Sequence, residues 1–123
     1  MQLHALHQEI FDIVAVHLLT QNKRAVAVNG SSCMYRTETG LKCAIGCLIP
    51  DEKYSPAFEG SSISLLGAKA LLPEKYKDTP LIYLISLQRL HDGCPVNRWR
   101  TELKNFAEQI SLSPAVVLNF TEE

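Results

Sequence analysis

The sequence predicts an α+β fold, in which a mostly helical single domain over residues 1–123 contains one small antiparallel β-hairpin. Two observations predict helices: apolar residues recur at helical spacing near the N-terminus, and they do so again in the C-terminal half. A third observation predicts the hairpin, because two short extended segments flank the turn sequence Thr37-Glu38-Thr39-Gly40. A length of 123 residues fits one domain.

Residues 3–20 are predicted to form an amphipathic helix, because their apolar side chains recur every three or four residues. The stripe consists of Leu6, Ile10, Ile13, Val14 and His17, widened by Leu3, Phe11 and Leu18. The polar run 20–24 should end the helix, since Asn22 tolerates the left-handed conformation of a helix end. A histidine on an apolar face, such as His17, is typically a core residue bonded to a backbone carbonyl.

The middle of the chain carries the predicted hairpin. Residues 25–29 are expected to be extended and to end in the turn pair Asn29-Gly30. Residues 33–36 and 41–43 are expected to pair as two short strands on either side of the 37–40 turn. Residues 44–49 should form a short helix that stops at Pro50, and residues 51–60 should form a loop.

Three further helices are expected in the second half. The first covers residues 62–72 and ends at Pro73. The second covers residues 80–91, because Thr79-Pro80 supplies a capping residue followed by a proline at the first helical position. The third covers residues 96–110, where Trp99 is expected to anchor the core. Residues 113–118 should form a short final turn.

Composition and charge exclude several classes of protein. The net charge is −1 and no basic block stands out, so nucleic-acid binding is not expected. No apolar run approaches the roughly 20 residues that a membrane span needs, and the N-terminus lacks the pattern of a signal peptide. We therefore expect a cytoplasmic protein that is not bound to a membrane. Its four cysteines should be reduced rather than paired.

A thiol-dependent enzyme is one interpretation of the run that follows the hairpin. If a strand ends at Cys43 and a helix begins next, unpaired backbone N–H groups near the sulfur would lower its pKa. The candidate catalytic residues are then Cys43 as nucleophile and His91 as base, with Asp92 as its partner and His17 as a second source of imidazole. Adjacent His and Asp side chains diverge on a helix, which weakens the pair. The alternative is that the cysteines are small buried apolar residues.

A metal site is the second interpretation that the spacing allows. Cys43 and Cys47 would share a helix face, His91 and Cys94 lie three residues apart, and Cys33 could replace Cys94. The usual Cys-x2-Cys spacing is missing, so neither a metal nor a cofactor is predicted.

Ligand binding is the third interpretation. Tyr35 and Tyr54 bracket the cysteine-containing run, and Gln88 lies one turn before His91 on a largely apolar helix. Together with Glu59 they are the candidate ligand-binding residues. The acidic pair Asp51-Glu52 is read as a solvated loop.

Two motifs extend these observations. The first is Lys42-Cys43-Ala44-Ile45-Gly46-x-Leu48-Ile49-Pro50-Asp51-Glu52-x-Tyr54, and the second is Leu87-Gln88-x-x-His91-Asp92. Both resemble the pattern of a family of small uncharacterised proteins associated with bacteriophages, prophages and bacterial genomes. The resemblance implies a phage or mobile-element setting and assigns no activity. Cys47 is less typical of the pattern than Cys43.

The sequence therefore predicts a small intracellular binding or regulatory module that is directed at a host protein or a small ligand. The alternative function is a small thiol-dependent hydrolase or transferase with Cys43 as nucleophile. The oligomeric state is not predicted.

Overall fold

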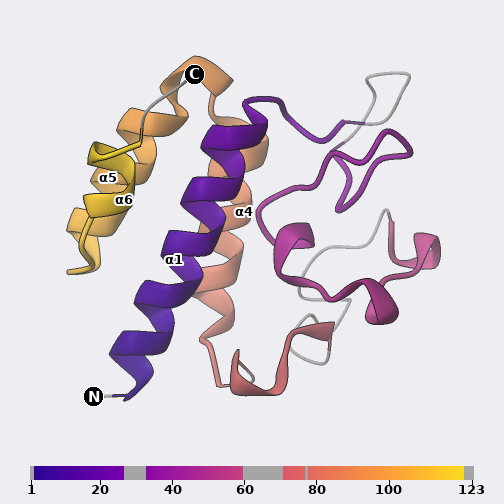
Figure 1. Ribbon diagram of the computed structural model, residues 1–123, viewed down its shortest axis with the longest axis horizontal. Helices are drawn as coiled ribbons and strands as arrows, with labels where there is room; N and C mark the ends of the chain where they lie inside the picture. Colours follow the sequence, from indigo (N-terminus) through magenta and orange to yellow (C-terminus); the bar gives the residue numbers. More distant parts are fainter. Residues whose placement is uncertain (1, 27–32, 60–70, 77, 121–123) are drawn as a thin grey trace.

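The computed structural model describes residues 2–26, 33–59, 71–76 and 78–120 (Figure 1). In this part the chain forms the α-helices α1 (Gln2–Gln21), α4 (Leu81–Gly93), α5 (Trp99–Gln109) and α6 (Ala115–Leu118). Short 3-10 turns lie at Gly46–Leu48, Asp51–Lys53, Pro56–Phe58, Glu74–Tyr76 and Val96–Arg98. The helices gather on one side of the molecule, and the irregular segment 33–59 lies on the other side.

The predicted α+β class is wrong, because the described residues are all-α and contain neither a strand nor a sheet. The arms of the predicted hairpin meet at one isolated bridge, between Arg36 and Lys42, and a second isolated bridge joins Cys33 to Val26 in the preceding segment. The turn between the arms is present: the Gly40 N–H donates to the Thr37 carbonyl at 3.1 Å, and Gly40 has a φ of 93°. Such a positive φ is easily adopted by glycine.

The pairing between the two arms does not extend, because side chains from other segments accept hydrogen bonds from the backbone N–H groups of the arms. The Glu59 carboxylate accepts hydrogen bonds from the backbone N–H groups of Tyr35 and Arg36, at 2.9 and 3.1 Å. The Gln21 side chain of α1 accepts the N–H of Lys42 at 2.9 Å. Each buried donor therefore has a partner, but the partner is a side chain rather than a neighbouring strand.

The predicted helices in the described part form close to their expected bounds. The expected segment 44–49 forms only the 3-10 turn Gly46–Leu48, and the expected loop 51–60 contains two further 3-10 turns. The helix predicted over 62–72 lies outside the described residues apart from its last two positions, as do residues 27–29 of the predicted extended segment and the Asn29-Gly30 turn.

The core forms between α1, α4, α5 and α6. Trp99 is fully buried, as predicted, and it lies at the start of α5, which contacts both α1 and α4. The fully buried side chains of α1 are Ile10, Phe11, Val14, Ala15 and Leu18. Ile13 was expected in this core, but it is 40% exposed.

Candidate functional site

The last turns of α4 bring a group of polar side chains to the irregular segment. The Gln88 amide donates to the Asp92 carboxylate at 2.9 Å, and Nδ1 of His91 lies 2.6 Å from the same carboxylate oxygen. The expectation that His91 and Asp92 diverge is therefore wrong, because the Asp92 carboxylate bends back along the helix. The Cys33 sulfur lies within 4.8 Å of this carboxylate and of the His91 ring. We call Cys33, Gln88, His91 and Asp92 the Asp92 cluster.

The two ring nitrogens of His91 are both engaged. Its side chain is fully buried and stacks on Trp99, with the ring centroids 5.5 Å apart. The backbone N–H of Ala25 donates to Nε2 at 3.0 Å. An accepting Nε2 carries no proton, so the ring proton lies on Nδ1 and is directed at Asp92. His91 thus bridges the segment after α1 to the end of α4.

Cys33, His91 and Asp92 place their ligand atoms within 4.8 Å of one another, and no other set of three or more potential metal ligands occurs in the described part of the chain. The alternative set of Cys43, Cys47, His91 and Cys94 is not brought together. A metal ion on Nδ1 of His91 would displace its proton to Nε2, where the Ala25 N–H already points. The arrangement fits a hydrogen-bonded cluster better than a metal centre.

The side chain of Cys43 is fully buried. Its own N–H donates to the Tyr35 carbonyl at 3.1 Å, and the Gly46 N–H donates to its sulfur at 3.2 Å. The expected N–H groups near the sulfur are therefore present. Burial nevertheless raises the pKa of the Cys43 thiol to about 12, since desolvation outweighs the hydrogen bonds to the sulfur from Gly46 and Ile45.

Among the histidines whose side chains the structure describes, neither His91 nor His17 is free to take the proton of Cys43. Both nitrogens of His91 bond to Ala25 and Asp92. The Nε2 atom of His17 lies 2.9 Å from the carbonyl oxygen of Lys42, which confirms the predicted bond to a backbone carbonyl, although His17 is only partly buried. A thiol with a raised pKa and no free base nearby is a poor nucleophile.

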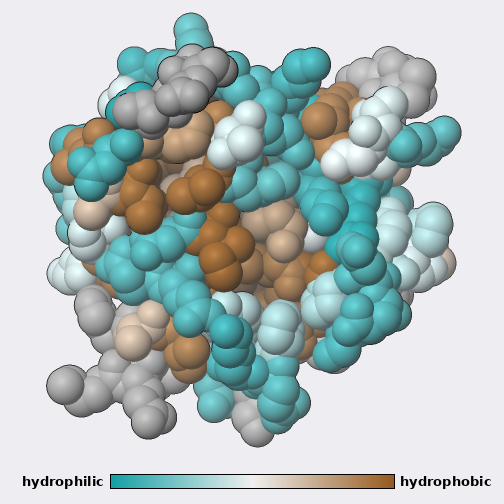
Figure 2. Space-filling model, in the orientation of Figure 1, coloured by the Kyte–Doolittle hydropathy of each residue, from teal (hydrophilic) through white to brown (hydrophobic). Residues whose placement is uncertain are grey.

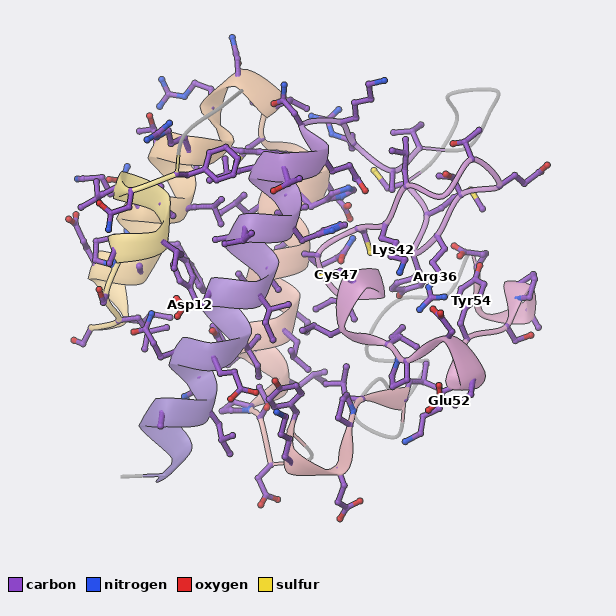
Figure 3. All side chains as sticks on the ribbon, in the orientation of Figure 1. Asp12, Arg36, Lys42, Cys47, Glu52 and Tyr54 are labelled. Carbon is purple, nitrogen blue, oxygen red and sulfur yellow. The ribbon has the colours of Figure 1, made fainter. Side chains whose placement is uncertain are left out.

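A second group of polar side chains surrounds Glu59. In addition to two backbone donors, its carboxylate accepts the Tyr54 hydroxyl at 2.5 Å. The Arg36 guanidinium lies over the Tyr54 ring, 4.8 Å from its centroid, and bonds to Asp51 at 2.7 Å. Figure 3 shows Arg36 and Tyr54 together on the irregular half of the molecule. We call Tyr35, Arg36, Tyr54 and Glu59 the Glu59 cluster.

The two clusters are connected through the run that contains Cys43. The Gln88 side chain accepts the Ile45 N–H at 3.2 Å, and the Tyr35 carbonyl accepts the Cys43 N–H. A Cβ atom on Gly46 would stand 2.0 Å from the Tyr35 carbonyl oxygen, so no side chain fits there. The run that contains Cys43 therefore lies between the two clusters, and Gln88 fastens it to α4.

Arg24 is a member of this region that the sequence did not reveal. Its guanidinium donates to the carbonyl oxygens of His91 at 3.1 Å and Cys94 at 2.7 Å, where it satisfies acceptors at the end of α4. Arg24 stands 67 residues before His91. No local pattern could have indicated this contact.

The opposite side of the molecule presents apolar side chains. Figure 2 shows them gathered over α6 and the adjoining part of α1. The exposed large apolar residues of these helices are Ile13 (40%), Val16 (42%) and Leu118 (55%). We call these three residues the apolar face. Helices α1 and α6 are in contact, so the face spans two elements of the core.

No family model, curated protein or solved structure matches the chain. Within the residues that the structure describes, none of the helices combines the length and the apolar character required for crossing a bilayer.

Proposed function

We propose that this protein is a binding module that recognises a protein partner through the apolar face of Ile13, Val16 and Leu118. The observation that carries the proposal is that the chemically reactive side chains are hydrogen-bonded or buried within the fold. Gln88 of the Asp92 cluster ties the irregular segment to α4, the Glu59 cluster ties that segment to itself, and the nucleophile candidate Cys43 is fully buried. Since these side chains are engaged within the fold, the arrangement supports recognition of a partner by the exposed surface of the protein.

The apolar face supports a protein as the partner. Ile13 and Val16 lie one turn apart on a helix whose remaining apolar side chains are largely buried, so their exposure is not required by the core. A patch of exposed apolar side chains on a protein surface often marks a site of interaction with another protein. The resemblance to phage-associated proteins favours a host protein of the bacterial cytoplasm as this partner.

An affinity purification from a bacterial host lysate tests the proposal. The wild-type chain is compared with the double variant Ile13→Glu/Val16→Glu and with the control Ala5→Glu/Thr20→Glu, which adds the same charge at exposed positions of α1. The proposal expects one protein that is retained by the wild type and the control and lost with the first variant. The purified partner should then bind about 100-fold more weakly to the first variant.

Two results contradict the proposal. The first is that no protein distinguishes the two double variants, which removes the apolar face as a recognition surface. The second is rapid modification of Cys43 by iodoacetamide at neutral pH, faster than free cysteine and lost in Cys43→Ser. That result would instead support the thiol-dependent hydrolase or transferase.

A further inference from the structure

A pocket of about 280 Å³ lies where the N-terminal half of α1 meets the start of α4 and the end of α5. It shares no residue with the apolar face or with the two polar clusters. The lining residues are His7, Pro80, Ile82, Tyr83, Ser86, Phe106, Ile110 and Leu112.

The wall of the pocket is largely aromatic and aliphatic. The rings of Tyr83 and Phe106 are parallel within 1°, with centroids 5.9 Å apart, and the His7 ring lies 5.2 Å from that of Tyr83. Ile82 and Ile110 contribute apolar side chains that are 65% and 40% exposed. Burying them on a ligand would remove apolar surface from water, which favours binding.

Two polar groups in the wall have unused hydrogen-bonding capacity. The Nε2 atom of His7 is buried, and no described residue provides it with a hydrogen-bond partner. The Ser86 hydroxyl donates to the Ile82 carbonyl at 2.8 Å, which leaves its oxygen able to accept a further bond. A buried nitrogen without a partner is uncommon and often indicates a bound water or ligand. The Tyr83 hydroxyl likewise donates its proton, to the His7 carbonyl at 2.7 Å.

We propose that this pocket binds a small two-ring aromatic molecule that carries a hydroxyl group. An apolar cavity of roughly 150 Å³ accepts benzene, so a volume of about 280 Å³ accommodates two fused rings. The rings pack against Tyr83, Phe106 and the two isoleucines. The hydroxyl group both donates and accepts. When Nε2 of His7 carries the proton, the ligand oxygen accepts from it and the ligand proton is available to the Ser86 oxygen; when Nε2 is unprotonated, the hydroxyl group donates to it instead. This site goes beyond the proposed partner binding and does not depend on it.

Titration of the wild-type chain with 2-naphthol, followed by amide NMR spectra, tests the proposal. Naphthalene is the matched probe, because it has the same rings without the hydroxyl group. We expect saturable shifts confined to the lining residues of α4, α5 and α1, and an affinity for 2-naphthol about three- to tenfold higher than for naphthalene. No saturable binding of either probe, or shifts centred on another part of the chain, would overturn the proposal without the need for a variant.

Two sets of variants then locate the ligand. Ser86→Trp fills the pocket and should abolish binding of both probes, whereas Arg89→Trp places the same side chain on an exposed position of α4 and should leave it unchanged. His7→Leu or Ser86→Ala should remove the preference for 2-naphthol while naphthalene still binds. The amide spectra show whether both variants are folded. If they are, and the Ser86→Trp and Arg89→Trp chains bind the probes equally, then the probes bind elsewhere.

Discussion

The Nε2 atom of His91 accepts a hydrogen bond from the backbone N–H of Ala25, although the two residues are 66 positions apart in the chain. The contact joins the segment that follows α1 to the last turn of α4. Because the ring is fully buried and stacks on Trp99, its position is fixed from three sides: by Ala25, by Asp92 and by the indole.

Replacing His91 by alanine should strongly destabilise the protein. The change leaves a cavity beside Trp99 and a buried Ala25 N–H without a partner, which together cost about 3 kcal/mol. Urea unfolding measures the loss. The control is Arg89→Ala, an exposed change on the same helix that should stay within about 0.5 kcal/mol of the wild type. Equal stability of the two variants would contradict the assigned role of His91.

Gly46→Ala should be among the most destabilising single changes in the chain. Its Cβ would overlap the Tyr35 carbonyl oxygen at 2.0 Å, and that oxygen also accepts the Cys43 N–H, so the backbone has to move. We expect a loss of about 3 kcal/mol or more. Gly93→Ala is the matched control, since a Cβ there meets no atom within 4 Å and should stabilise the end of α4 by roughly 0.5 kcal/mol. Thermal unfolding of both variants checks the contrast.

Glu59→Ala should loosen the irregular half of the molecule. It removes one acceptor from three donors: the N–H groups of Tyr35 and Arg36 and the Tyr54 hydroxyl. The expected loss is about 2–3 kcal/mol, because hydrogen bonds to a carboxylate are stronger than neutral ones. Glu52→Ala removes an exposed carboxylate from the same segment and should have little effect. Faster amide hydrogen exchange in residues 33–59 of the Glu59 variant alone would support the assignment.

The buried thiol of Cys43 should make stability depend on pH in the alkaline range. Its pKa is about 12 in the folded chain, against 9.0 for the free group, so the unfolded chain releases the proton first. The thiol's contribution is therefore complete below pH 9 and is lost as the pH rises towards 12. Between pH 9 and pH 10 the wild type should lose roughly 1 kcal/mol more than Cys43→Ala. Parallel pH dependence of the two chains would show that the thiol is not buried.

The helices could be predicted from the sequence because their signals are local. Periodic apolar residues and the core position of Trp99 depend on neighbours within one or two turns. The expected Thr79 cap is wrong in detail, because α4 begins at Leu81 after Pro80 and has no side-chain cap. Ile13 matched the same periodicity and still proved exposed, since the pattern does not show which edge of a stripe a neighbouring helix covers.

The prediction of the hairpin was wrong because the contacts that decide it are not local. Turn residues 37–40 gave a correct local signal, but the backbone donors beside the turn bond to Glu59 and Gln21, which no short-range rule connects to them. The structure places the candidate residues in the Asp92 cluster, in the Glu59 cluster and in the run between them. Their roles were not predictable, because Arg24, the amide of Ala25 and the burial of Cys43 depend on contacts between distant segments.

A segment anchored by side chains has a different sensitivity to sequence change from a sheet. In a sheet, many interchangeable residues share the backbone pairing, so single substitutions are widely tolerated. Here Gln21, Glu59, Gln88 and His91 each hold particular amides of distant residues. Random mutagenesis of this protein should therefore give intolerant positions at these four polar residues in addition to the buried apolar ones.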